Sequence, residues 1–175
     1  MPSSSAETRP RSKPGWAEAR WGGPWVAFAA ILAGAAALRL VGIEYGHPFA
    51  LFSPDEQSIV PRAWHMAHGG GLDPHWFDYP TLLMYVLAPF QAWQAHPSYV
   101  AARAVVVVFA LGAVAASWWL GRRAYGPIAG LVAAVAVAVD TTHVAYSRMS
   151  VTDVPLTCGV AVSLAFLVGG NAPEV

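Results

Sequence analysis

Four apolar stretches constrain the fold of this chain more than any other feature of its sequence. With their flanking residues, each approaches the roughly 20 residues that an α-helix needs to cross a bilayer. Only 11% of the residues are charged, against about 25% in soluble domains, so the chain cannot cover its surface in water. We therefore predict an all-α membrane protein with about four transmembrane helices, at residues 24–41, 99–120, 127–145 and 153–169.

The first 23 residues differ from the rest of the chain. Their serines, prolines and basic side chains predict a disordered cytoplasmic tail, because such a segment cannot bury a core. A cleaved signal peptide is the alternative, since three alanines at residues 35–37 would suit a cleavage site. The apolar stretch continues to Val41 and three more follow, so we expect the first span to be retained. A short tail, residues 171–175, follows the last span.

A fifth apolar stretch, residues 79–93, determines the topology. It is bounded by one proline and interrupted by another, and its length suits an interfacial helix better than a span. If this stretch does not cross, the basic tail and the Arg122-Arg123 pair both lie in the cytoplasm, as the positive-inside rule favours. The N-terminus is then cytoplasmic, and the loop at residues 42–98 lies on the outer side of the cell (inner) membrane.

The outer loop is predicted to contain two helices that lie on the membrane surface. The first, residues 56–68, has one apolar face at roughly helical spacing and ends at three glycines, residues 69–71. The second covers residues 80–95. The same topology returns the segment at residues 147–153 to the outer side, the same side as Asp55.

Three acidic residues of the outer side are candidates for chemistry. Asp55 and Glu56 directly follow a proline, and Asp153 opens the fourth span. All three would also suit an ordinary helix start, where Asp caps and Glu stabilises the first turn. Their setting, a small polar region held against the membrane, favours a functional interpretation.

Other polar residues lie near the outer ends of the spans. Arg148 suits an interfacial anchor, a partner for Asp153 or a phosphate clamp. Asp140 and His143 are one helical turn apart, and we expect them to form a hydrated structural pair. Arg39 is expected to extend to the interface as a snorkelling side chain. The zero net charge excludes a basic nucleic-acid-binding face.

The order of motifs is informative as a set. An arginine in the first span precedes the Asp-Glu pair, the glycine break and Tyr-Pro-Thr-Leu at residues 79–82. A Gly-Arg-Arg turn at residues 121–123 and Tyr-Ser-Arg at residues 146–148 then precede Asp153. This order resembles the N-terminal half of the GT-C glycosyltransferases, above all the protein O-mannosyltransferases and the bacterial lipid A aminoarabinose transferases. The resemblance covers about residues 38–168.

The resemblance implies transfer of a sugar from a polyprenyl-phosphate donor to a hydroxyl of a glycan, lipid or protein at the outer face. Asp55 would act as the base behind the anomeric carbon, giving inversion. Glu56 and Asp153 would be the other catalytic acids. The resemblance also implies six substrate-binding residues, of which the arginines would hold the lipid phosphate. They are Arg148, Tyr79, Pro80, Arg62, Arg103 and His143. A divalent cation could bind among Asp55, Glu56, Asp153 and His143, although their spacing does not require a metal.

Two departures from the family pattern argue against aminoarabinose as the sugar. Asp-Tyr-Pro-Thr at residues 78–81 replaces a Lys-Pro-Pro type motif, and Ser58 stands where those transferases have an arginine. Members of the family also continue through many more spans. We therefore expect this chain to be a fragment, a truncated reading frame or half of a split protein, and to be inactive alone.

Two other functions are compatible with the sequence. A proton-coupled carrier would use Arg39, Asp140 and His143, although a carrier should have ionisable groups near the membrane midplane and an internal repeat. A non-catalytic membrane module would explain the early end of the chain.

Overall fold

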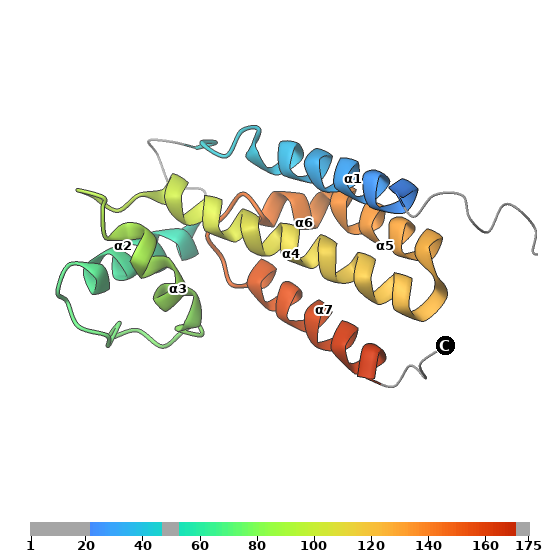
Figure 1. The fold of residues 1–175 in the computed structure, drawn as a ribbon. Helices are drawn as coiled ribbons and strands as arrows, with labels where there is room; N and C mark the ends of the chain where they lie inside the picture. The colour runs from blue at the N-terminus through green and yellow to red at the C-terminus, as the bar shows by residue number, and fades with distance from the viewer. Residues whose placement is uncertain (1–21, 47–52, 171–175) are drawn as a thin grey trace, which may run out of the picture.

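The computed structural model describes residues 22–46 and 53–170, and in these residues it contains seven helices and no strand. The predicted tails at residues 1–23 and 171–175 lie outside the described residues, apart from Gly22 and Gly23, which begin the first helix. The helices form a bundle with a smaller helical unit at one end (Figure 1). The prediction of an all-α fold is confirmed.

The bundle is organised around one long helix, α4 (Tyr99–Tyr125). Helices α1 (Gly22–Leu40), α5 (Pro127–Val139) and α7 (Asp153–Gly170) all pack against α4 (Figure 1). The contact between α4 and α5 is close because Gly130 has no side chain. A Cβ atom at Gly130 would lie 2.7 Å from the carbonyl oxygen of Trp118. Small residues of this kind let membrane helices approach one another.

The outer surface of the bundle is apolar. Two helices, α1 and α4, are long and apolar enough to cross a membrane. Among the described residues, α3 (Leu82–Gln91), α5 and α7 are shorter apolar helices. Soluble proteins rarely expose apolar patches of this extent. The chain thus has the fold of an all-α membrane protein. Large apolar side chains exposed on the bundle include Val26, Val108, Ile128, Val132, Leu156 and Phe166.

The third predicted span is not one continuous helix. Helix α5 ends at Val139, and Asp140 has non-helical backbone angles (φ −57°, ψ 119°). The Oδ1 atom of Asp140 accepts a hydrogen bond from the backbone N–H of His143 at 2.6 Å, and a separate short helix, α6 (Thr141–Tyr146), follows. The predicted helix at residues 127–145 is therefore broken where an aspartate caps a new helix.

The smaller unit consists of α2 (Pro54–Ala67) and α3 (Leu82–Gln91), which pack against each other and against the start of α4 (Figure 1). Helix α2 starts two residues earlier than predicted, and α3 is shorter than the predicted helix at residues 80–95. Gly69 and Gly71 have positive φ angles, as expected of the predicted glycine break. The shared core contains Ile59, Val60, Ala63, Leu83, Met84, Leu87, Ala102 and Val106.

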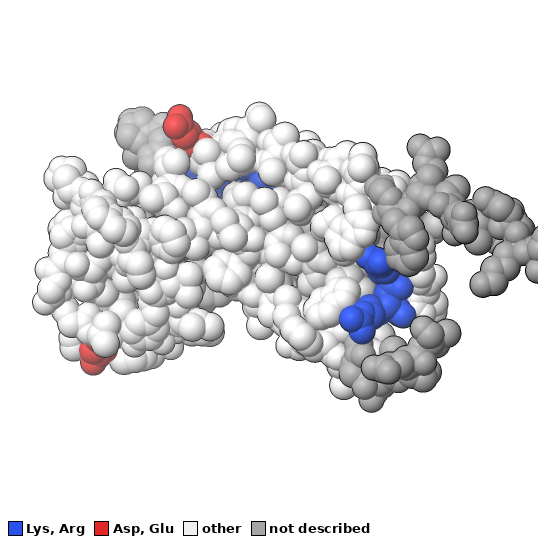
Figure 2. Space-filling view, viewed as in Figure 1, with Lys and Arg blue, Asp and Glu red and all other residues white. Residues whose placement is uncertain are grey.

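The two ends of the bundle differ in charge and in structure. Helix α1 ends and α4 begins at the end where α2 and α3 lie, so α3 does not run back along the bundle (Figure 1). Arg122 and Arg123, in the last turn of α4, lie at the opposite end. Figure 2 shows the basic side chains there and a largely uncharged surface elsewhere on the same face. Which end faces the cytoplasm stays a prediction.

Candidate active site at the α2–α3 end

Two of the acidic residues singled out in the sequence approach the same tyrosine. The phenol of Tyr79, in the segment before α3, is hydrogen-bonded to the carboxylate of Asp55 at the start of α2. This hydrogen bond and the negative charge of Asp55 raise the pKa of Tyr79 above the usual value of 10.0, with smaller contributions from burial and from the charge of Asp153. Asp153, the first residue of α7, thus lies close enough to act on the phenol. We call Asp55, Tyr79 and Asp153 the acidic cluster.

The first turn of α2 explains how Asp55 is positioned. Pro54 occupies the start of the helix, where its missing N–H has no partner to lose, and Ser53 is the N-cap residue. Asp55 is therefore a first-turn residue and not the cap. Its negative charge lies at the positive end of the helix dipole, an interaction that stabilises the helix start.

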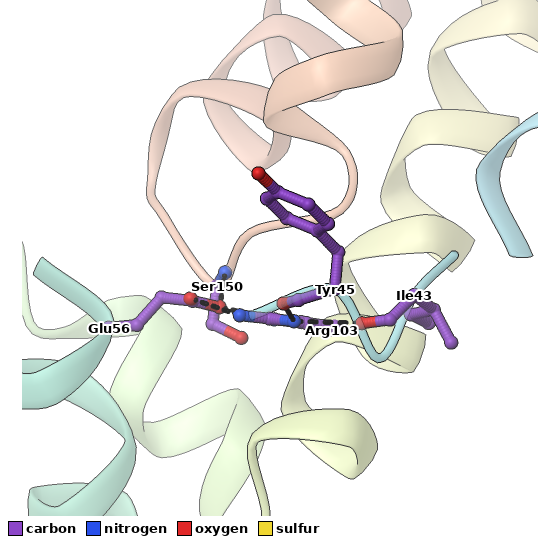
Figure 3. Close-up of polar contacts among 5 residues, drawn as sticks. All are labelled: Ile43, Tyr45, Glu56, Arg103 and Ser150. Carbon is purple, nitrogen blue, oxygen red and sulfur yellow. Dashed lines mark hydrogen bonds and ion pairs between the residues drawn. The ribbon is translucent and has the colours of Figure 1, made fainter. Parts of the chain in front are cut away.

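Glu56, the next residue, has a different environment, shown in Figure 3. Its side chain is fully buried, and both carboxylate oxygens accept hydrogen bonds from Arg103 of α4, at 2.8 Å and 2.7 Å. The backbone N–H of Ser150 donates to the same carboxylate at 2.6 Å. The remaining Arg103 nitrogen, Nη1, donates to the carbonyl oxygens of Ile43 and Tyr45, each at 2.8 Å.

These contacts, which we call the Glu56–Arg103 pair, connect four parts of the chain. The turn after α1, the start of α2, α4 and the segment before α7 all contribute a partner (Figure 3). Arg103 is buried, and a carboxylate and two carbonyls satisfy it inside the protein. The contacts of Glu56 and Arg103 are structural. Their predicted chemical roles stay predictions.

Arg39 is a second buried arginine, and the prediction that it snorkels is wrong. It has no exposed surface. Among the described residues, no carboxylate hydrogen-bonds to it, and its hydrogen-bond partners are three backbone carbonyls and two side chains. These are the Ala35, Val137 and Ala138 carbonyls (3.0–3.1 Å), His143 Nδ1 (2.9 Å) and Ser147 Oγ (3.3 Å).

The break after α5 gives the physical reason for the position of Arg39. The last carbonyls of a helix have no partner within it, and a cation near them is also stabilised by the helix dipole. Val137 and Ala138 provide such carbonyls, because α5 ends at Val139. Arg39, a residue of the neighbouring α1, thus donates hydrogen bonds to the unpaired carbonyls at the end of α5.

The other predicted phosphate-binding arginines are placed apart from one another. Arg62 donates to the Ser58 carbonyl at 2.7 Å, and its guanidinium lies 4.6 Å from the centre of the Trp76 ring. Arg148 donates to the carbonyl of Leu38 and borders an apolar groove between α1 and α5. The sequence allowed three roles for Arg148: an interfacial anchor, a partner for Asp153 or a phosphate clamp. Its described contacts include no pairing with Asp153.

A second apolar groove begins beside the acidic cluster. It has a volume of about 730 Å³ and runs along α3, α4 and α7. Pro80 and Thr152, direct neighbours of Tyr79 and Asp153 in the sequence, border it. The predicted site residue Pro80 is therefore part of an apolar surface that adjoins the acids.

No group of three or more His, Cys, Asp and Glu side chains suited to a metal ion occurs among the described residues. Glu56, one of the four residues considered for a cation, is already engaged by Arg103 and Ser150. A divalent cation at this site stays a prediction.

The sequence did not indicate the partners that hold the site together. The backbone groups of Ile43, Tyr45 and Ser150 carry no side-chain signal. The side chains of Arg39 and Arg103 did give a signal in the sequence. An arginine within an apolar stretch has to be neutralised or hydrogen-bonded when it is buried, so each of them required partners.

Comparison with known proteins gives one match. The family model for dolichyl-phosphate-mannose-protein mannosyltransferases matches residues 71–174, more than half of the chain. The match includes Tyr79, Arg103, Arg148 and Asp153, and it begins after Asp55. No match was found among curated proteins or among solved structures. With its all-helical membrane fold and its ordered motifs, this chain belongs to the dolichyl-phosphate-mannose-protein mannosyltransferase family.

Proposed function

We propose that this chain provides the acidic face of an inverting glycosyltransferase that takes mannose from a polyprenyl-phosphate donor. The acceptor is a protein hydroxyl at the outer face of a membrane that the chain crosses several times, with its N-terminus in the cytoplasm. The observation that carries the proposal is the acidic cluster. Asp55 and Tyr79 come from separate segments and are hydrogen-bonded at the end of an apolar bundle, and the charge of Asp153 acts on the same phenol. An apolar groove bordered by Pro80 and Thr152 lies beside them.

The chemistry needs one base and stabilisation of one leaving anion. The donor leaves as a phosphate ester, an anion already, so it needs charge stabilisation more than a general acid. The acceptor hydroxyl needs a carboxylate behind the anomeric carbon, and attack from there inverts that centre. Asp55 suits this role because its neighbour Glu56 is neutralised by Arg103, whereas Asp55 has a phenol as its described partner.

Tyr79 supports an ionised base. A phenol that donates a hydrogen bond to a carboxylate stabilises the charged form of that carboxylate. Because its own pKa is raised, Tyr79 stays protonated across the neutral range and keeps donating. Its role in the proposal is to orient Asp55.

The donor lipid would use the apolar surface beside the cluster. An isoprenoid chain suits the groove along α3, α4 and α7, whose lining is overwhelmingly apolar. The phosphate requires a cation, and Arg62 and Arg148 are the candidates with no carboxylate partner in their described contacts. Arg103 is already neutralised by Glu56.

The proposal is tested by Asp55→Asn. Because we expect the chain to be inactive alone, membranes are taken from cells that express it in its full-length context. They are supplied with radiolabelled mannosyl polyprenyl phosphate, and label in protein is measured against membranes without it. We expect transfer to fall at least about 100-fold, as for loss of a general base. The amount of membrane-inserted protein should not change.

Asp73→Asn is the matched control, because Asp73 is an exposed acid of the same loop that pairs with His75. It should retain normal transfer. Retained transfer in Asp55→Asn overturns the assignment of the base. No transfer above background with the unaltered sequence in its full-length context overturns the proposed activity.

A further inference from the structure

The apolar groove between α1 and α5 is a surface that the proposed function does not use. Its volume is about 530 Å³. Ala35 and Ala138, which are buried, lie at its base, and exposed side chains such as Leu38 and Val139 border it. Small residues where the two helices meet therefore leave a hollow in the apolar surface of the bundle. We call it the α1–α5 groove.

The α1–α5 groove is separate from the groove proposed for the donor lipid. The donor groove runs along α3, α4 and α7, and the two grooves share no lining residue. Figure 1 shows α1 and α7 on opposite sides of α4. A molecule that fills one groove therefore leaves the other open.

A cation lies at the α2–α3 end of the α1–α5 groove. Arg148 is the one charged side chain among the described residues that line it. Its Nη2 atom donates to the carbonyl of Leu38, and its Nη1 atom lies 3.9 Å from the position of a Cβ atom at Gly42, in the turn after α1. Among the described residues, Arg148 forms no ion pair, and Nη1 has no hydrogen-bond partner. The guanidinium thus has a charge and a donor available for an anion.

The length of the groove matches one leaflet of a membrane. Its lining residues in and directly after α1 begin at Ile31 and end at Val41. At about 1.5 Å per residue they span about 15 Å, half of the roughly 30 Å of a hydrocarbon core. A partner helix would extend through both leaflets, whereas a phospholipid acyl chain ends within one. The dimensions therefore favour a phospholipid.

The charges around Arg148 favour an anionic headgroup. Arg39 lies close enough for the two guanidinium charges to act on each other. The carboxylate of Asp140 also acts on Arg39, and its Oδ1 atom already accepts from the backbone of His143. Two cations and one anion leave a net positive charge, and guanidinium groups bind phosphate oxygens well.

We propose that the α1–α5 groove binds one anionic glycerophospholipid, with an acyl chain against Gly34 and Ala35 and the phosphate hydrogen-bonded to Arg148. The lipid fills the hollow between the helices and neutralises the charge of Arg148. This site is independent of the proposed function. It leaves Arg62 as the arginine available for the donor phosphate.

Photolabelling tests the proposal without a transfer reaction. The sequence in its full-length context is placed in phosphatidylcholine nanodiscs that contain a phosphatidylglycerol with a diazirine on one acyl chain. Labelled peptides are identified by mass spectrometry, and unlabelled phosphatidylglycerol, diacylglycerol or polyprenyl phosphate is added as competitor. We expect label on α1 and α5, and phosphatidylglycerol should compete about 10-fold better than diacylglycerol, which has no phosphate.

Gly34→Leu tests the groove, and Gly159→Leu is its matched control. A Cβ atom at either glycine has no atom within 4 Å, so each position has room for a side chain. Gly34 lines the α1–α5 groove, and Gly159 lines the donor groove. Gly34→Leu should reduce the label on α1 and α5 about 10-fold, and Gly159→Leu should leave it unchanged.

Arg148→Gln tests the phosphate contact. Glutamine keeps a donor for the carbonyl of Leu38 and removes the charge, so the advantage of phosphatidylglycerol over diacylglycerol should fall about 10-fold. Arg148→Lys keeps the charge and should retain most of that advantage. Equal losses in the two variants would mean that the phosphate does not bind the charge at residue 148, and this result overturns the proposal.

The unaltered sequence and Gly34→Leu keep the proposal falsifiable if the Arg148 variants do not fold. Equal competition by phosphatidylglycerol and diacylglycerol overturns it, and so does unchanged label in Gly34→Leu. Stronger competition by polyprenyl phosphate than by phosphatidylglycerol would assign the groove to the donor lipid instead. An absence of label on α1 and α5 would mean that another helix covers the groove. Both of these outcomes also overturn the proposal.

Discussion

Glu56 and Asp55 follow each other in the first turn of α2, yet their environments are opposite. Glu56 is fully buried and hydrogen-bonded to Arg103 and to the backbone of Ser150. Asp55 is partly exposed and bonded to the phenol of Tyr79, with Asp153 nearby. Consecutive residues of a helix point about 100° apart, so one turn can serve two regions.

Glu56 contributes to the stability of the fold, whereas Asp55 is available for chemistry. A buried carboxylate that is already neutralised by an arginine is a poor base, because taking up a proton would leave the arginine charge unpaired. A partly exposed carboxylate that accepts a phenol hydrogen bond, as Asp55 does, stays available. The Glu56–Arg103 pair therefore fixes the helix start that presents Asp55 to the acidic cluster.

The largest expected effect comes from Glu56→Ala. It leaves the Arg103 guanidinium buried with only the carbonyls of Ile43 and Tyr45 as partners. Breaking one side of a buried pair costs about 3–5 kcal/mol. Thermal unfolding in detergent measures the change, with Glu44→Gln, an exposed acid of the same loop, as the control. A loss below about 1 kcal/mol would mean that the pair does not hold α2 in place.

A smaller effect is expected from Arg103→Lys, which keeps the charge and removes the fork of donors. A lysine ammonium cannot donate to both oxygens of Glu56 and to two carbonyls in the same geometry. We expect a loss of about 1–3 kcal/mol in the free energy of unfolding, smaller than for Glu56→Ala. If the two substitutions cost the same, charge alone explains the pair and the fork geometry adds nothing.

Part of this arrangement was predictable from the sequence. The scarcity of charge predicts a helical membrane protein, and the proline and glycine signals predict two helices in the first loop. Counting spans predicted that Asp55 and Asp153 share one side, and the structure brings both to Tyr79. Asp55 and Asp153 are almost one hundred positions apart, and only the order of the helices made their common effect on Tyr79 foreseeable.

The pairing of the arginines was not predictable in the same way. The prediction that Arg39 snorkels assumed that lipid is the only neighbour of its helix, whereas α5 lies beside Arg39 and provides carbonyl acceptors. Asp140 could have indicated this, because an aspartate before Thr141 and Thr142 is a typical helix cap, and a new helix there leaves the carbonyls of α5 unpaired. Arg103 and Glu56 are 47 positions apart, and only tertiary packing selects Glu56 over Asp55 as its partner.

The smallest effect concerns the titration of Tyr79. The protonated phenol donates to Asp55, and its ionised form would lose that bond and face two carboxylates, so its pKa in the folded protein is raised above 10.0. The contribution of this hydrogen bond to stability is therefore complete below the pKa of an unfolded tyrosine. It is lost only as pH rises through the higher folded value.

The tyrosinate absorbance of the folded chain, minus that of Tyr79→Phe, isolates this one transition among the six tyrosines. In an Asp55→Asn background the same difference should move to lower pH, because both the charge and the preferred acceptor are removed. Asp153→Asn should move it less, since Asp153 contributes only its more distant charge. Equal shifts would place the two acids at similar distances from the phenol. An unchanged transition in Asp55→Asn would mean that Asp55 has no hydrogen bond to Tyr79 in solution, and the contrast with Glu56 would then rest on burial alone.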